Sequence, residues 1–84
     1  KNKCIYCGDN SESIDHLHPR SKGGKTISSN CVPCCLSCNG KKSDYEVLAW
    51  YRKQNFYDPR RAMAIRAWFN KDIKLASLLL NYIN

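Results

Sequence analysis

The spacing of apolar and polar residues divides the chain into two parts. Up to about position 44 the apolar stretches are short, and Gly, Ser, Asn and Asp residues separate them. This pattern predicts loops and short strands, with one strand at residues 13–17 and a second at residues 31–33. A helix is expected from about Cys35 or Leu36 to Lys42, although Gly40 weakens it.

From about position 45 onward, apolar residues recur at helical spacing. A helix is expected after an N-cap at Ser43 or Asp44 and should end near position 55. Asp58 followed by Pro59 is typical of an N-cap and first helical residue, and Asp72 is expected to cap a last helix. The predicted fold class is therefore α+β and mostly helical, with a short hairpin and helix followed by two to three further helices.

Length and charge narrow the class of protein. A chain of 84 residues is long enough for one domain, so we expect a single domain at residues 1–84. Within it, residues 1–44 should form the core and residues 45–84 a helical extension. The formal net charge of +7 favours a nucleic-acid partner, although many small domains are basic for no specific reason. No stretch approaches the roughly 18 apolar residues of a membrane span, and no leader is visible, so we expect a soluble, cytoplasmic protein without a membrane partner.

Six cysteines offer a way to stabilise so small a core. Gly8 directly follows one C-x-x-C pair and suits a sharp knuckle turn. Cys31 and Cys34 are more simply small buried apolar residues than ligands. Three disulfides in a secreted domain remain an alternative. The paired spacing favours a tetrahedral thiolate site for structural Zn²⁺, made by Cys4, Cys7, Cys35 and Cys38.

Asp15 and His16 place a carboxylate beside an imidazole, and cations and a glycine pair follow within ten residues. Successive side chains of a regular strand point to opposite faces, so the two would not share one face. They can still flank one phosphate group if a metal ion lies at the edge of the strand. A structural aspartate that orients a neighbouring histidine is the alternative interpretation.

Four motif blocks follow one another between positions 4 and 44. They are Cys4-x-x-Cys7-Gly8, Asp15-His16-x-x-Pro19-x-Ser21-x-Gly23-Gly24, Asn30-x-Val32-Pro33 and Cys35-x-x-Cys38-Asn39-x-x-Lys42. In order and spacing, these blocks resemble the HNH endonucleases. The resemblance covers about half of the chain and implies a ββα-metal core, a hairpin and a helix that hold one catalytic divalent ion, together with a structural zinc.

The resemblance also implies residue roles. Asp15 and Asn39 would bind catalytic Mg²⁺ or Mn²⁺ through oxygen atoms, which such hard ions prefer. Asn39 stands where the family often has His. His16 would be the general base that takes a proton from water, and Asn30 would tie the loop and orient the histidine. Cleavage of DNA would leave a 5′-phosphate and a 3′-hydroxyl. His18 could bind the phosphate or the metal, or simply face solvent.

Basic and aromatic residues extend this hypothesis. The large aromatic residues of the helical half are expected to form core and not to stack on bases. The apolar residues near the carboxyl end could form a face for a dimer or larger assembly. A non-catalytic zinc module that binds DNA or protein is the alternative to a bacterial or phage nuclease. Candidate phosphate contacts, each of which could also be an ordinary solvated side chain, are Arg20, Lys22, Lys25, Lys41 and Lys42.

Overall fold

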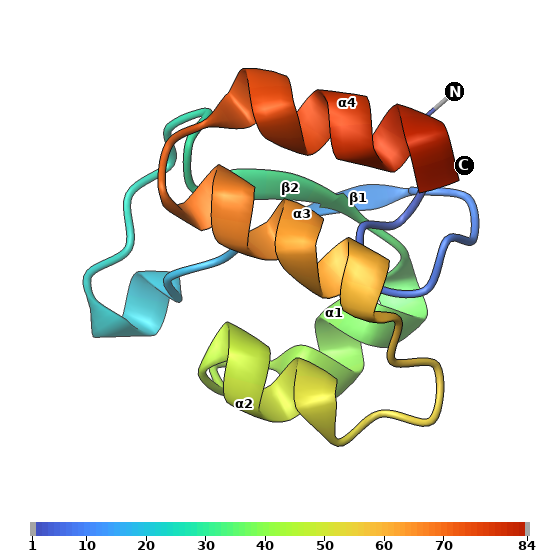
Figure 1. Cartoon of the computed structure of the whole chain (residues 1–84). Helices are drawn as coiled ribbons and strands as arrows, with labels where there is room; N and C mark the ends of the chain where they lie inside the picture. Colours follow the sequence, from blue (N-terminus) through green and yellow to red (C-terminus); the bar gives the residue numbers. More distant parts are fainter. Residues whose placement is uncertain (1, 84) are drawn as a thin grey trace.

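The computed structural model describes residues 2–83 and shows a small hairpin surrounded by helices (Figure 1). The α+β, mostly helical class predicted from the sequence is confirmed. Three helices follow the ββα unit, at the upper limit of the prediction. In chain order, the elements are β1 (Ser13–His16), a 3-10 turn η1 (Arg20–Lys22), β2 (Cys31–Cys34), α1 (Leu36–Lys42), α2 (Val47–Arg52), α3 (Pro59–Phe69) and α4 (Ile73–Ile83).

The two strands pair antiparallel, with Ser13 opposite Cys34 and Asp15 opposite Val32. Because side chains alternate along a strand, Val32 and Cys34 both point into the core and are fully buried. Each strand differs by one residue from its predicted bounds. Residues 17–30 join the strands as a long loop, which contains the turn η1 and lies to the left in Figure 1.

Helix α1 begins after Cys35, whose Sγ accepts a hydrogen bond from the Cys38 backbone N–H at 3.4 Å. Its predicted bounds are confirmed, and Gly40 does not interrupt it. The predicted N-cap of the next helix was wrong. Ser43 instead ends α1 with a φ of 49° and donates its N–H to the Asn39 carbonyl. Glu46 caps α2, because its carboxylate accepts the backbone N–H groups of the second and third helical residues.

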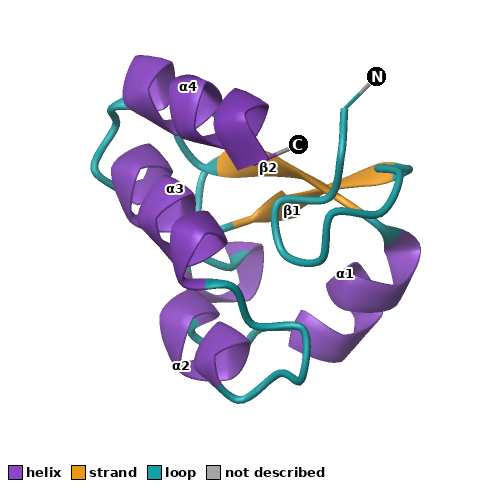
Figure 2. Cartoon of the chain, turned by 45° about the vertical axis from the view of Figure 1, so that its right-hand side comes forward, coloured by secondary structure: helices purple, strands orange, loops and turns teal. Residues whose placement is uncertain are grey.

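The caps of the last two helices were predicted correctly. Asp58 accepts the Arg60 N–H at 2.9 Å with Pro59 at the first helical position, and Asp72 accepts the Leu75 N–H at 3.2 Å. Helices α3 and α4 run antiparallel side by side in both cartoon views (Figures 1 and 2). No helix within residues 2–83 is long and apolar enough to cross a membrane.

The core draws residues from both ends of the chain. Tyr6 contacts Trp50 edge to face at 5.2 Å between ring centroids, and Tyr51 donates its hydroxyl to the Tyr6 carbonyl at 2.8 Å. The expected aromatic core is thus confirmed for Trp50 and Tyr51, but Phe69 is 47% exposed. Helix α4 leaves an apolar face exposed, with the side chains of Leu75, Leu78 and Tyr82. The role of this face in assembly stays a prediction.

Candidate active site and metal centre

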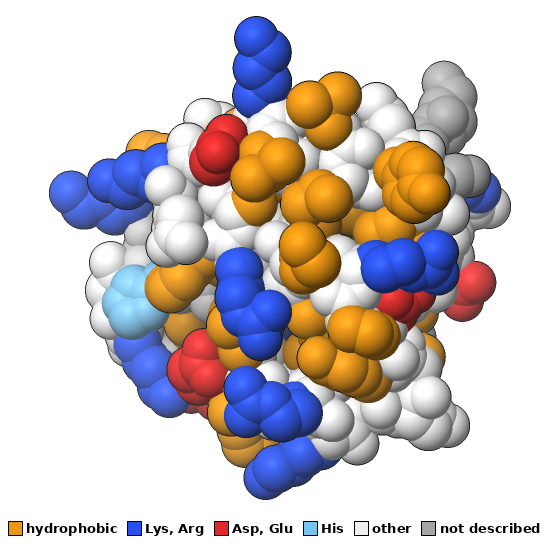
Figure 3. Space-filling model, viewed as in Figure 1, with side chains coloured by type: hydrophobic (Ala, Val, Ile, Leu, Met, Phe, Trp, Pro, Cys, Tyr) orange, Lys and Arg blue, Asp and Glu red, His pale blue; other side chains and the backbone are white. Residues whose placement is uncertain are grey.

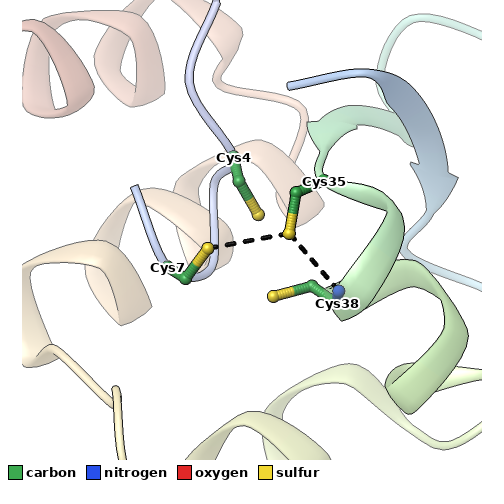
Figure 4. A group of neighbouring side chains, drawn as sticks. All are labelled: Cys4, Cys7, Cys35 and Cys38. Carbon is green, nitrogen blue, oxygen red and sulfur yellow. Dashed lines mark hydrogen bonds between the residues drawn. The ribbon is translucent and has the colours of Figure 1, made fainter. Parts of the chain in front are cut away.

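Four cysteine thiols converge between the N-terminal knuckle and the start of α1 (Figure 4). The Sγ atoms of Cys4, Cys7, Cys35 and Cys38 all lie within 4.8 Å of one another, and those of Cys7 and Cys35 are 3.7 Å apart. A tetrahedral zinc ion with Zn–S bonds of about 2.3 Å would need sulfurs about 3.8 Å apart. The geometry therefore fits a metal ion. All six cysteines are free thiols, so the disulfide alternative was wrong.

Helix α3 packs against the knuckle around Cys4 through the side chain of Arg61. Gly8 has a φ of 85°, and a Cβ atom there would come within 2.5 Å of the Arg61 guanidinium. Arg61 is buried and donates to the Cys4 carbonyl at 3.2 Å. Glycine is thus required at position 8, as predicted, because the backbone there has a positive φ and because Arg61 fills the space that a side chain would need.

The thiols would not all ionise without a cation. Burial, together with the nearby Cys4 thiolate, raises the pKa of Cys7 to about 11. Burial likewise raises the pKa of Cys38. In contrast, a hydrogen bond with Cys34 lowers the pKa of Cys4 to about 4. A bound divalent ion favours the thiolates and releases protons, so metal affinity should fall as pH falls.

Asp15 lies almost completely buried, with 5% of its surface exposed, and is held by two side chains. Tyr6 donates its hydroxyl to Asp15 Oδ2 at 2.6 Å, and Lys42 Nζ lies 3.2 Å from the same oxygen. Lys42 also donates to the His16 carbonyl at 3.2 Å. Burial and the Asp15 charge raise the pKa of Tyr6 well above its usual value, so its hydroxyl remains a donor. The segments that carry the two cysteine pairs therefore both contribute to positioning Asp15, since Tyr6 lies between Cys4 and Cys7 and Lys42 ends α1, the helix that begins after Cys35.

Lys42 corrects the list of predicted phosphate contacts. Its side chain is fully buried and forms an ion pair, so it cannot reach a DNA backbone from this position. The adjacent Lys41 is exposed. Sequence alone could not separate two consecutive lysines, because only the way α1 packs on β1 decides which one faces Asp15.

His16 is half-buried, and its Nε2 lies 3.0 Å from Thr26 Oγ1. Asp15 and His16 line the same surface pocket of about 380 Å³, whose wall also contains Arg20, Ser21 and Asp44. The pocket thus brings the predicted Asp-His pair together with a cation. Asp44, which accepts a hydrogen bond from Ser21 at 3.4 Å, is a second carboxylate there that we expected only as a helix cap.

Asn39 does not line that pocket. Its Nδ2 donates to Ser13 Oγ at 3.2 Å and to the Ile14 carbonyl at 3.1 Å, beside Asp15 on β1. Both amide hydrogens are thereby used, and Oδ1 has no hydrogen-bond partner among the described residues. An oxygen donor is therefore free next to the Asp15 strand, and such a donor suits a hard cation.

Asn30 fastens the long loop to its own start. The side chain accepts the His18 N–H at 2.7 Å and donates to the carbonyls of His18 and Lys25 at 3.0 and 2.8 Å. Gly24 is required at this closure because a Cβ atom there would lie 1.7 Å from the His18 carbonyl oxygen. The His18 side chain is exposed and lies in a different pocket from Asp15 and His16.

The remaining predicted phosphate contacts lie at the surface. Figure 3 shows basic side chains and a histidine together at the left edge, where Figure 1 places the loop of residues 17–30. Of these cations, Arg20 lines the pocket of Asp15 and His16, and exposed cations at this surface suit a polyanion. The exposed members of the predicted set are Arg20, Lys22, Lys25 and Lys41.

Breaking the buried ion pair tests its contribution to stability. Lys42→Met should lower the free energy of unfolding by about 3–5 kcal/mol, because Asp15 keeps its charge in a buried place without a cationic partner. The matched Lys41→Met variant removes an exposed charge and should change stability by less than about 0.5 kcal/mol. Urea unfolding with zinc present and Mg²⁺ absent would measure both. Equal stability of the two variants would contradict the pairing of Lys42 with Asp15.

The hairpin, α1 and the cysteine cluster together make a small ββα unit that could hold a metal ion. Residues 4–45 match the model of the HNH endonuclease family, and the chain belongs to that family. A curated relative, the "SPbeta prophage-derived putative HNH endonuclease YoqL" of Bacillus subtilis (strain 168), is 34% identical over 83% of this chain. The chain spans only 36% of the length of that relative. No solved structure matches significantly.

Proposed function

We propose that this chain is the catalytic module of a metal-dependent DNA endonuclease that leaves a 5′-phosphate and a 3′-hydroxyl. The observation that carries the proposal is the pocket in which Asp15 and His16 meet beside Arg20, in a chain of the HNH endonuclease family. The net charge of +7 and the exposed cations of the predicted set support DNA as substrate.

Asp15 and Asn39 would hold the catalytic Mg²⁺ or Mn²⁺. When bound, such an ion stabilises negative charge on the scissile phosphate and on the leaving oxygen. Asp15 still has free lone pairs after its contacts with Tyr6 and Lys42, because a carboxylate can accept about four hydrogen bonds. Asn39 offers Oδ1 from the neighbouring helix.

His16 would act as the general base. With Nε2–H donating to Thr26, Nδ1 keeps a lone pair that can take the proton of the attacking water. Lys42 holds the His16 carbonyl and Asn30 closes the loop that carries Thr26, so both position the imidazole indirectly. Arg20, in the same pocket, would contact a phosphate oxygen of the substrate.

Zn²⁺ is proposed as the ion of the four-cysteine cluster, with a purely structural role. Four thiolate sulfurs and no open ligand position are typical of a structural zinc site. The further proposed phosphate contacts are Lys22, Lys25 and Lys41. His18 is left outside the catalytic centre because it lies in another pocket.

One observation favours the alternative, a non-catalytic zinc module that binds DNA or protein. Asp15 is nearly buried and already paired with Lys42 and Tyr6, as a purely structural carboxylate would be. In that case the basic surface would bind its partner without cutting it. Activity and product chemistry distinguish the two functions.

Purified protein with supercoiled plasmid should produce nicked circles in Mg²⁺ or Mn²⁺ and none with the zinc-loaded protein alone. The nicks should be sealed by DNA ligase without further treatment, because ligase needs a 5′-phosphate beside a 3′-hydroxyl. A zinc-loaded, folded protein that retards plasmid but never nicks it with either metal would instead support the binding module.

A further inference from the structure

A second pocket opens between the long loop and the turn that joins α3 to α4. Its volume of about 260 Å³ lies just below the roughly 300–1,000 Å³ of ordinary small-molecule sites, so it suits one ring system and not a large ligand. Neither Asp15 nor His16 lines it. The residues that line it and carry the argument are His18, Lys25, Ile27, Asn30, Phe69 and Lys71.

The walls of this pocket are fixed by hydrogen bonds. Trp68 donates its indole N–H to the Ser28 carbonyl at 2.8 Å, which ties the end of α3 to the loop. Asn30 closes the loop from the other side, with three hydrogen bonds to the backbone of His18 and Lys25. A ligand would therefore meet a formed surface and would not have to order the loop first.

Phe69 departs from the aromatic core and supplies the apolar wall. It is 47% exposed, and Ile27 on the loop is 50% exposed. Both line the same pocket. Large apolar side chains that face one concave site at the surface are typical of a place where a ligand binds.

The charges around the pocket select the kind of ligand. Lys25 and Lys71 line it, and no Asp or Glu does so among the described residues. Thr26, next to Lys25, contacts the His16 ring, so the pocket is one loop residue away from the proposed catalytic centre. A pocket with an aromatic wall and two lining cations fits a nucleotide, whose base is flat and apolar on its faces and whose phosphates are negative.

We propose that this pocket receives one unstacked nucleobase of the DNA substrate. Phe69 stacks on the base, and Lys25 and Lys71 bind phosphates on either side of it. The proposal rests on DNA as the substrate of the proposed function, but not on cleavage. It makes the helical extension part of substrate binding, because Phe69 and Lys71 come from α3 and the turn after it.

Binding to single-stranded oligonucleotides tests the base contact. In a His16→Ala background without Mg²⁺ or Mn²⁺, so that the oligonucleotide stays uncut, Phe69→Ala should weaken binding of an oligothymidine about fivefold or more. This is the equivalent of about 1 kcal/mol or more for one stacked base. It should change binding of an abasic oligonucleotide of equal length less than twofold. Met63→Ala is the matched control, since Met63 is exposed on the same helix but outside the pocket. Fluorescence anisotropy measures the binding of both oligonucleotides by each of the two variants.

Salt dependence tests the flanking cations. Lys71→Gln should reduce the slope of log affinity against log salt concentration by about 0.7, the value for one phosphate contact on a single strand. If Phe69→Ala weakens the abasic and the base-containing oligonucleotides equally, or no more than Met63→Ala does, the pocket binds no base. Failure of plasmid nicking, with these binding differences intact, would overturn the proposed nuclease and not the base pocket.

Discussion

His16→Ala is expected to reduce the rate of plasmid nicking about a hundredfold or more. Removal of a general base typically lowers the rate roughly 10²–10⁴-fold, because the attacking water then has no positioned group to accept its proton. The His16 side chain is half-buried and its imidazole contacts the exposed Thr26 hydroxyl, so the variant should fold. The measurement is the initial rate of conversion of supercoiled to nicked plasmid in Mg²⁺ and in Mn²⁺.

Added imidazole sharpens this test. It should restore part of the activity of His16→Ala, because a free base can occupy the space that the ring has left. The control variant Asn55→Ala, at an exposed position between α2 and α3, should nick at the normal rate. If His16→Ala nicks as fast as the unaltered protein, another group removes the proton or the activity comes from a contaminating nuclease.

The elements that could be predicted from the sequence are those determined by local chemistry. Asp58 with Pro59 and Asp72 act within one turn of their helices, and both caps were predicted correctly. The predicted N-cap of α2 was wrong because two other candidate caps, Ser43 and Asp44, come just before Glu46, which caps the helix. Ser43 is used to end α1 instead, and nothing in its immediate neighbours indicates that choice.

In the site, too, the features determined by nearby residues could be predicted, and those that depend on the fold could not. The C-x-x-C spacing constrains each cysteine pair within a few residues, so the cluster could be predicted. The contacts of Asp15 could not, because Tyr6 and Lys42 are 9 and 27 residues away and reach it only through the fold. Exposure of Phe69 likewise depends on where α3 ends against the loop, since Trp68 beside it is tied to Ser28.

Loss of one cluster cysteine should have the largest effect on the protein. Cys38→Ser is expected to prevent stable folding, because Cys4, Cys35 and Cys38 are buried within the hydrophobic core. A structural zinc site contributes about 10–16 kcal/mol in small zinc domains, as much as the whole stability of a typical protein, about 5–15 kcal/mol. Zinc content per chain and thermal unfolding followed by circular dichroism measure the effect. Cys31→Ser is the matched control, a half-buried cysteine outside the cluster, and should keep its metal.

The consequence for the proposed catalytic centre follows from the positions of Tyr6 and Lys42. Tyr6 lies inside the first knuckle and Lys42 ends the helix that begins beside the second, so both contacts of Asp15 depend on the cluster. Cys38→Ser should therefore lose nicking even in excess Mg²⁺, whereas Cys31→Ser should retain it. A Cys38→Ser protein that contains no zinc yet unfolds at the normal temperature would show that the core, and not the metal, holds Asp15 in place.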